Sequence, residues 1–211
     1  MTFMLIEYQR AFETLKRLRF LIFLMLVVFF AVAIAAHFVF SAQFQADSAK
    51  MEQQMMRLAE LFNEKDVLDA SGQLSVTGLF FNNFIASGMA VVMGGIAFLF
   101  VPLASLALNA AIVGVMSAIM STAGIGGFFD LVVSIAPHGV FEIPALLIST
   151  AMGVALCLDI SARILRKKRD RSFSALLAEI ARVSVLVVVP LLAVAAVLEV
   201  YLTPALMAIL L

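Results

Sequence analysis

The chain has 211 residues, of which 64% are hydrophobic and only 13% are charged. Soluble proteins contain about 45–50% apolar and about 25% charged residues, and the mean hydropathy here is +1.12. So few charges cannot cover a water-exposed surface, which excludes a soluble enzyme and indicates an integral membrane protein. Basic and acidic residues balance at 14 each, which excludes a basic surface for nucleic acid.

Five apolar segments are long enough to cross a membrane as helices. A helix rises ~1.5 Å per residue, so about 20 residues cross the roughly 30 Å hydrocarbon core. The predicted spans are residues 20–40, 84–101, 104–123, 143–161 and 183–202. Pro102 is assigned to the turn between the second and third spans, because proline readily ends a helix. Pro190 is expected to kink the fifth.

The basic residues predict which helix ends face the cytoplasm. With the N-terminus, the Pro102 turn and residues 163–182 inside, all but three of the 14 Lys and Arg residues are cytoplasmic. The positive-inside rule therefore predicts an all-α integral membrane protein of five helices, with the N-terminus in and the C-terminus out. We expect it in the cell (plasma or inner) membrane as a multi-pass protein.

We expect a single membrane domain, residues 1–211, in four parts. Residues 1–19 mix apolar and charged side chains as an amphipathic helix on the inner surface does, and residues 20–40 form an uncleaved first span. Residues 41–78 are extracytoplasmic, and residues 79–211 form a four-helix core.

The outer segment carries one amphipathic stripe. Met51, Met55, Leu58 and Phe62 follow at steps of four, three and four, which places them on one helical face. This face either packs on the protein's own outer surface or docks a partner, for which methionine side chains suit adaptable contacts.

The densest polar group within apolar sequence is FFDLVVSIAPHGVFEIP at residues 128–144. Its ionisable and helix-breaking residues are Asp130, Pro137, His138, Gly139, Glu142 and Pro144. Residues 128–136 would extend only ~13 Å as a helix, too short to cross. We expect Pro137 and Gly139 to end this helix and a new one to begin with Glu142 and Pro144 in its first turn. The result would be a broken re-entrant or interfacial helix before the fourth span.

His138 and Glu142 need a reason to be there, because ionisable side chains inside a membrane are costly. One hypothesis is a proton- or ion-linked site. The alternative is that both brace the break in the helix, with His138 hydrogen-bonded to nearby backbone or asparagine. Two ligands are too few for a metal ion, and His37 lies in another span, so we expect no metal and no cofactor.

Polar and small residues elsewhere in the spans suggest helix–helix contacts. Asn82 and Asn83 open the second span and Asn109 lies in the third. Asparagine commonly hydrogen-bonds across membrane helices, with substrate contact as the alternative. Small residues that allow helices to approach closely are Gly88, Gly94, Gly95, Ala110 and Gly114.

Two acidic residues lie near helix ends. Glu199 precedes the outer end of the fifth span, either as an interfacial carboxylate that reaches headgroups or as an inward-facing functional acid. Asp159 and Arg163 are four residues apart at an inner end, where we expect an ordinary ion pair. The sequence contains no phosphate-binding P-loop and no hydrolase motif, so we expect no enzymatic activity and no catalytic residue.

Several strings together resemble the stage II sporulation protein M family of five-helix membrane proteins. They are FFNNF at residues 80–84, Asn109, PHGVFEIPA at 137–145 with Gly153 downstream, and EVYLTP at 199–204. The resemblance covers roughly residues 79–211, and PHG-x-x-E-x-P looks like the wider, non-sporulation branch. Family positions that it carries over, without any catalytic role, are Asn82, Asn83, Asn109, Pro137, His138, Gly139, Glu142, Pro144, Glu199 and Pro204.

The resemblance implies a polytopic membrane protein that associates with other proteins. Sporulation members associate with two peptidoglycan-degrading partners during engulfment of the forespore. We therefore expect a scaffold or accessory subunit for envelope-associated partners. The alternative is the membrane (permease) subunit of an ABC-type exporter with a separate cytoplasmic ATPase, in which residues 1–19 act as a coupling element. Expected partners are the lipid bilayer and other membrane or extracytoplasmic proteins. Small-residue helix faces permit a homodimer without requiring one.

Overall fold

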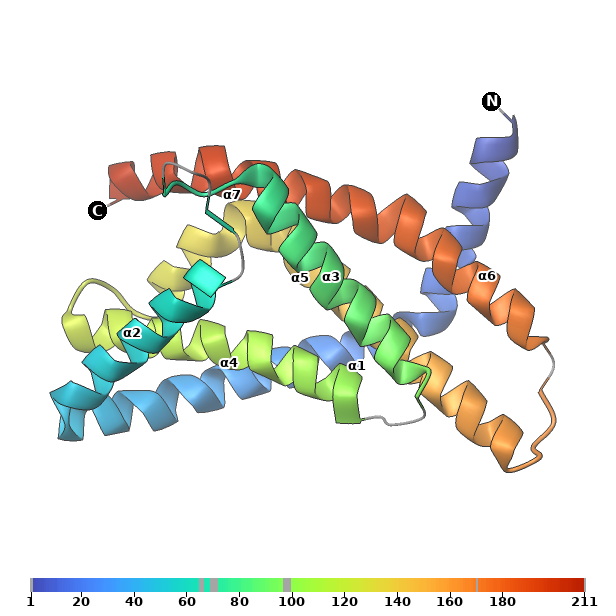
Figure 1. Ribbon diagram of the computed structural model, residues 1–211, viewed down its shortest axis with the longest axis horizontal. Helices are drawn as coiled ribbons and strands as arrows, with labels where there is room; N and C mark the ends of the chain where they lie inside the picture. Colours follow the sequence, from blue (N-terminus) through green and yellow to red (C-terminus); the bar gives the residue numbers. More distant parts are fainter. Residues whose placement is uncertain (1, 65–66, 69–71, 97–99, 170, 211) are drawn as a thin grey trace.

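The computed structural model describes residues 2–64, 67–68, 72–96, 100–169 and 171–210, and no strand lies within these ranges. The described chain is helical nearly throughout (Figure 1). Its helices are α1 (Thr2–Ala46), α2 (Ser48–Glu64), α3 (Val76–Gly94), α4 (Phe100–Ala123), α5 (Phe128–Ile164), α6 (Phe173–Val183), the π-helix η1 (Ser184–Val188) and α7 (Val189–Leu210).

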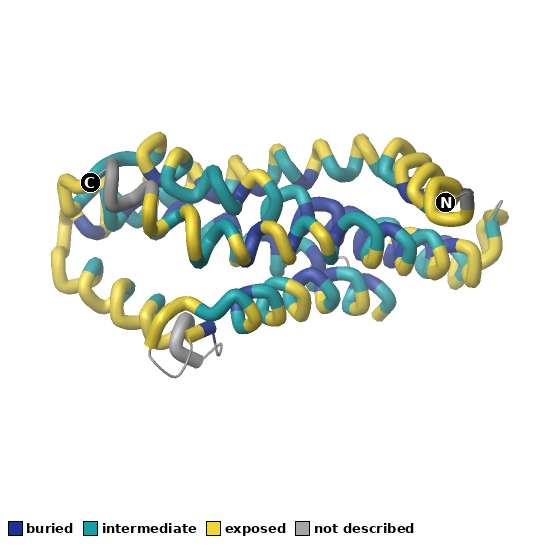
Figure 2. Tube along the Cα trace, turned by 90° about the horizontal axis from the view of Figure 1, so that it is seen from above, coloured by how far each residue is buried: buried dark blue, intermediate teal, exposed yellow. Residues whose placement is uncertain are grey.

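Five helical stretches are long and apolar enough to cross a membrane, as the sequence predicts. They are Phe3–Ala46, Val76–Gly94, Val101–Ala123, Phe128–Ile164 and Phe173–Ala205. Buried residues gather along the middle of the bundle, and exposed residues cover its outside (Figure 2). Many of the exposed side chains are large and apolar, such as Phe20, Phe23 and Phe38. A surface of this kind is suited to lipid, so the all-α membrane fold is confirmed.

The two ends of the molecule carry different elements (Figure 1). The N-terminus and the α5–α6 connection lie at one end, and α2 and the C-terminus lie at the opposite end. The basic N-terminal segment and the basic residues 163–182 therefore share one end, which is the grouping that the positive-inside rule requires.

Helix α1 joins two elements that the sequence separates. We expected a surface helix at residues 1–19 and a span at 20–40, but α1 runs without interruption from Thr2 to Ala46. Neither glycine nor proline occurs in that stretch, so nothing in it ends a helix. Figure 1 shows that the N-terminal part of α1 turns away from the rest. Leu15 and Leu18 of this part pack on the cluster that contains Leu176 and Ile180 of α6.

The sequence prediction is wrong about the bounds of the second span and about the position of the turn after it. We expected residues 84–101, but α3 begins at Val76, where the Ser75 side chain accepts a hydrogen bond from the Gly78 N–H at 3.2 Å. The helix ends at Gly94, and Pro102 lies in the first turn of α4 rather than in the connection. A proline is tolerated there because its missing N–H has no partner in a first turn.

Helix α5 corrects the expected break at Pro137 and Gly139. It is one continuous helix from Phe128 to Ile164 with Pro137 and Pro144 inside it, so Glu142 is not in a first turn. Figure 1 shows α5 as two arms, yellow and orange, that meet at a bend. A proline removes one backbone hydrogen bond and bends a helix. Without water to satisfy further backbone groups at membrane depth, bending costs less than breaking.

Two helix pairs approach closely through glycine. A methyl group at Gly94 of α3 would overlap the backbone carbonyl of Gly153 in α5, and one at Gly153 would overlap the carbonyl of Ala90. In the same way a methyl group at Gly114 of α4 would overlap the carbonyl of Ala33 in α1. The expectation of close helix approach is confirmed for Gly94 and Gly114. It is wrong for Gly88, around which there is open space.

The kink expected at Pro190 takes the form of a π-turn. Residues 184–188 form η1, and the Val189 N–H donates to the Ser184 carbonyl, five residues back. Such π-turns are a recognised way to accommodate a disturbed hydrogen-bond ladder inside a helix. Here the turn comes immediately before the proline that cannot donate.

Candidate functional site

Three ionisable side chains meet between α5 and α7. His138 and Glu142 are four residues apart in α5, so they share one helical face, and Glu199 in α7 lies opposite them. One ligand atom from each of the three residues lies within 4.8 Å of the others. None of the three residues is exposed.

The Thr203 hydroxyl orients the imidazole of His138. Nδ1 of His138 lies 2.9 Å from Oγ1 of Thr203, and that hydroxyl donates to the Leu198 carbonyl at 3.3 Å. A hydroxyl has a single hydrogen to donate, so Nδ1 carries the hydrogen and donates to Thr203. When the imidazole is neutral, Nε2 of His138 is then left with its lone pair, and in that form it can accept a proton or bind a cation.

Two carboxylates and one imidazole are the ligand types of a divalent cation, and all three also bind protons. Two ligands, His138 and Glu142, are evident from sequence, whereas the third belongs to α7, 57 residues after Glu142. The sequence predicted only two ligands, too few for a metal ion. The packing of α7 on α5 corrects this, because it adds Glu199 as a third. Of the two readings of Glu199, its position corresponds to the inward-facing acid.

The other polar residues of the predicted site lie elsewhere. Oδ2 of Asp130 accepts from the Gly127 N–H at 2.7 Å, so Asp130 caps the start of α5. Asn82 donates to Asn83 at 3.1 Å, and Asn109 donates to the Ser105 carbonyl of its own helix at 2.9 Å. These bonds stay within one helix, contrary to the expected bonds across helices.

A hydrogen bond between α1 and α4 comes from residues that the sequence reasoning did not pair. Ser117 Oγ lies 2.9 Å from Nδ1 of His37. A histidine inside the first apolar run was the available signal, but its partner depends on which helix packs beside it. The remaining residues of the predicted site lie within helices, Pro137, Gly139 and Pro144 in α5 and Pro204 in α7.

The methionine stripe of α2 divides between two environments. Met51 and Leu58 pack on a cluster of Phe44, Val115 and Ala118. Met55 is 49% exposed, and its neighbour Met56 is 60% exposed. The side chain of Phe62, the fourth residue of the stripe, lies outside the described residues.

Comparison with known families decides the relationship. The sequence model described as Stage II sporulation protein M matches residues 21–204. The chain belongs to the SpoIIM family. Neither the curated proteins nor the solved structures gave a match.

In this SpoIIM protein, two of the strings that carry the resemblance converge on one place. PHGVFEIPA supplies His138 and Glu142, and EVYLTP supplies Glu199 and Thr203. The start of α3, which carries FFNNF, packs nearby, because Leu79 and Phe80 share a cluster with Ala196 and Val200 of α7.

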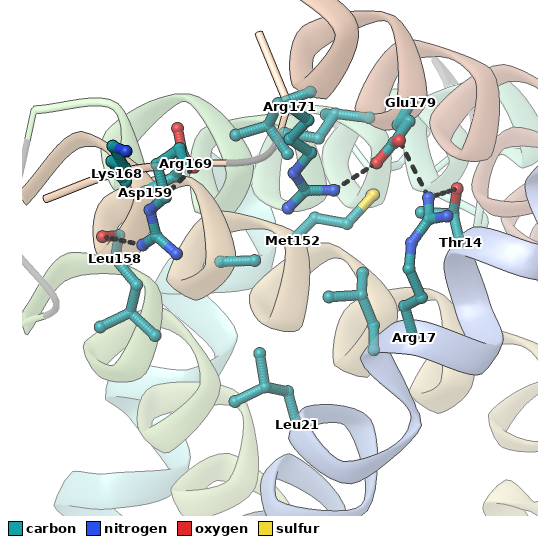
Figure 3. A pocket seen from close by; sticks show the side chains of 14 residues that line it. Thr14, Arg17, Leu21, Met152, Leu158, Asp159, Lys168, Arg169, Arg171 and Glu179 are labelled. Atoms are coloured by element: carbon teal, nitrogen blue, oxygen red, sulfur yellow. Dashed lines mark hydrogen bonds and ion pairs between the residues drawn. The ribbon is translucent and has the colours of Figure 1, made fainter. Parts of the chain in front are cut away.

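The end of this SpoIIM protein that carries the N-terminus and the α5–α6 connection holds a pocket of about 560 Å³ (Figure 3). It lies among the N-terminal part of α1, the last turns of α5, and α6 with the loop before it. Its lining residues are Thr14, Arg17, Leu18, Leu21, Met152, Ala155, Leu158, Asp159, Lys168, Arg169, Arg171, Leu176, Glu179 and Ile180. Sequence reasoning missed this pocket, although the basic run at residues 163–171 was a signal for it.

Ion pairs hold the pocket and its surroundings together. Glu179 of α6 pairs with Arg17 of α1 at 2.9 Å and with Arg171 at 2.6 Å. A further pair, between Glu7 and Arg182, ties the start of α1 to the end of α6.

Asp159 forms the second centre of charge at the pocket. Its side chain is only 3% exposed and pairs with Arg163 at 2.5 Å and with Arg169 at 3.4 Å. The expected ion pair with Arg163 is confirmed. It is a buried pair with a second arginine, whereas the sequence indicates only an ordinary one.

Proposed function

We propose that this SpoIIM protein is a non-enzymatic scaffold or accessory subunit that holds envelope-associated proteins at the cell membrane, with its N-terminus in the cytoplasm. The observation that carries the proposal is that α2 packs on the protein through one set of apolar side chains and exposes another. Met51 and Leu58 anchor the helix on the protein's own core, while Met55 and Met56 remain exposed.

The exposed part of α2 has the composition of a small protein-binding surface. Charged residues, Glu52, Arg57 and Glu60, surround the two methionines, and all three are exposed. Interfaces commonly combine an apolar centre that includes methionine with a polar rim. An extracytoplasmic protein is the partner that this surface supports, because α2 lies at the end opposite the basic one.

Replacing both exposed methionines, Met55→Ser with Met56→Ser, is expected to release the partner. Loss of a central interface pair costs about 2 kcal/mol or more, which lowers recovery of the partner by more than about tenfold. The measurement is affinity purification of the tagged protein from its own cells in mild detergent, with mass spectrometry of the bound proteins.

The matched control is Gln53→Ser, an exposed polar residue on the same helix, which should leave recovery unchanged. Thermal unfolding in detergent checks that both variants are folded. Full recovery of the same outward-facing partners with the double variant would contradict the docking role of α2.

A second candidate is the membrane subunit of an ABC-type exporter with a separate ATPase. The cluster of His138, Glu142 and Glu199 favours it, because ionisable groups inside a membrane commonly mark the path of an ion or proton. The ion pairs of Glu7 and Arg17 with α6 would also couple a movement of the N-terminal part of α1 to α6.

The exporter reading predicts that His138→Ala and Glu199→Gln abolish activity while the protein stays folded. Removing one member of a linked set of titratable groups interrupts proton or ion transfer but leaves the apolar packing between the helices in place. The purification already described separates the two functions: a stoichiometric cytoplasmic ATPase supports the exporter, and cell-wall hydrolases without an ATPase support the scaffold. Full activity in both variants would remove the exporter reading.

A further inference from the structure

The pocket at the inner end carries more positive than negative charge. Glu179 is shared by two guanidinium groups, those of Arg17 and Arg171, and Asp159 is likewise shared by Arg163 and Arg169. Each carboxylate therefore neutralises only half of the positive charge beside it. Lys168 also lines the pocket, and no ion pair joins it to another residue in the described ranges.

The guanidinium groups are held in place but remain accessible. The side chains of Arg17, Arg169 and Arg171 are 52%, 37% and 38% exposed. A guanidinium has five N–H donors, and the ion pairs of these arginines use only some of them. Figure 3 shows Arg17 and Arg171 reaching Glu179 from two sides, with Lys168 and Arg169 beside Asp159. Fixed guanidinium groups with free donors are suited to the oxygens of a phosphate group.

Apart from the Thr14 hydroxyl, the rest of the pocket lining is apolar. It consists of Leu18, Leu21, Met152, Ala155, Leu158, Leu176 and Ile180. A soluble anion would leave this part of the pocket in contact with water. A ligand with a phosphate group and an adjoining hydrocarbon chain would cover both parts. The volume of about 560 Å³ lies within the range of about 300–1,000 Å³ that small-molecule sites occupy.

The pocket lies where such a ligand is abundant. It opens at the ends of the spanning helices, on the side with most of the basic residues, which the positive-inside rule places against the cytoplasmic leaflet. Basic pockets between membrane helices at this depth bind anionic headgroups. We propose that the pocket among α1, α5 and α6 is a binding site for an anionic phospholipid, with the phosphate on the arginines and Lys168 and the acyl chain on the apolar lining.

Competition between two lipids tests this site. The purified full-length protein in neutral detergent is offered phosphatidylglycerol and phosphatidylcholine at equal concentration, and native mass spectrometry measures the lipid retained. We expect phosphatidylglycerol to be retained about tenfold over phosphatidylcholine, because each basic residue near the phosphate favours the anionic lipid. Equal retention of the two lipids would overturn the proposal.

Variants separate the pocket from general surface charge. Lys168→Ala is expected to reduce the preference severalfold without unfolding, because Lys168 makes no ion pair within the described ranges. Lys168→Ala with Arg169→Ala should abolish it. The matched control is Arg166→Ala with Lys167→Ala, which removes the same charge from the same loop outside the pocket lining. An equal loss in the control would overturn the proposal.

Inorganic phosphate distinguishes the two sources of the anion. Because phosphate cannot use the apolar lining, millimolar concentrations should leave phosphatidylglycerol bound. Displacement of the lipid by phosphate at those concentrations would overturn the lipid assignment in favour of a soluble anion. The lipid measurement involves neither α2 nor a protein partner, so its outcome is independent of the proposed scaffold function.

Discussion

Adding a single methyl group at Gly94 is expected to destabilise the protein strongly. In Gly94→Ala the new Cβ would overlap the Gly153 carbonyl, which is backbone and cannot rotate away. The α3 and α5 helices would have to separate, and overpacking of this kind costs up to about 3 kcal/mol. The measurement is the midpoint of thermal unfolding in detergent, together with the yield of monodisperse protein.

A glycine of the same helix provides the matched control. Gly88 has open space around the position of a Cβ, and alanine is a better helix former than glycine by about 1 kcal/mol. Gly88→Ala should therefore be neutral or stabilising, so of the two variants of α3 only Gly94→Ala is expected to lower the midpoint. A normal unfolding midpoint for Gly94→Ala would show that the α3–α5 crossing is not as close as described.

The second large loss of stability is expected when Asp159 is replaced by alanine. Its carboxylate is almost fully buried and pairs with Arg163 and Arg169. Asp159→Ala would leave two guanidinium groups without their counter-charge near the C-terminal end of α5. Removing one partner of a buried pair costs about 3–5 kcal/mol. We expect about 3 kcal/mol, because the two arginine side chains are about one-third exposed, 33% and 37%, and water takes up part of their charge.

Chemical or thermal unfolding of Asp159→Ala measures this loss. Glu13→Ala is the control, because Glu13 is an exposed acid at the same end of the molecule and makes no ion pair within the described ranges. Replacing Arg169 by leucine in the Asp159→Ala background should recover part of the lost stability by removing one unpaired charge. Equal stability of Asp159→Ala and the unaltered protein would contradict the buried network.

The number of membrane-spanning helices and the all-α class are predictable from the sequence because they depend on local properties. Each of the five apolar runs is long enough to span a membrane, and this depends only on length and hydrophobicity. The amphipathic character of α2 follows from the spacing of Met51, Met55 and Leu58 in the same way.

Helix boundaries inside continuous apolar sequence are harder to predict. The turn after α3 contains no charged residue, so hydropathy gives no sign of it, and Pro102 is a misleading signal. The Gly94–Gly95 pair was the better indicator of the helix end, because glycine is common just past the end of a helix. At Pro137 the sequence predicted a helix end where the structure has none. Neighbouring helices support α5 as it continues through this proline, which would end an isolated helix.

The candidate site was only half predictable. His138 and Glu142 stand four residues apart, so their shared face follows from helical geometry. The approach of Glu199 depends on the packing of α7 against α5, and no local pattern encodes it. Which methionines of α2 face the core likewise depends on where α2 lies relative to Phe44 and Val115.

The π-turn before Pro190 keeps two helices in rotational phase. The buried residues Leu176, Ile180 and Val183 of α6 follow steps of four and three, and the next buried residue, Val188, comes five residues later. In an ordinary α-helix five residues rotate by ~500°, which would leave Val188 about 140° away from Val183 around the helix axis and outside the buried stripe. The wider turn absorbs that extra residue, so Val188 and Leu192 join the same core cluster as Ile180. The fifth span therefore presents one uninterrupted inner seam, although its sequence carries the equivalent of a one-residue insertion.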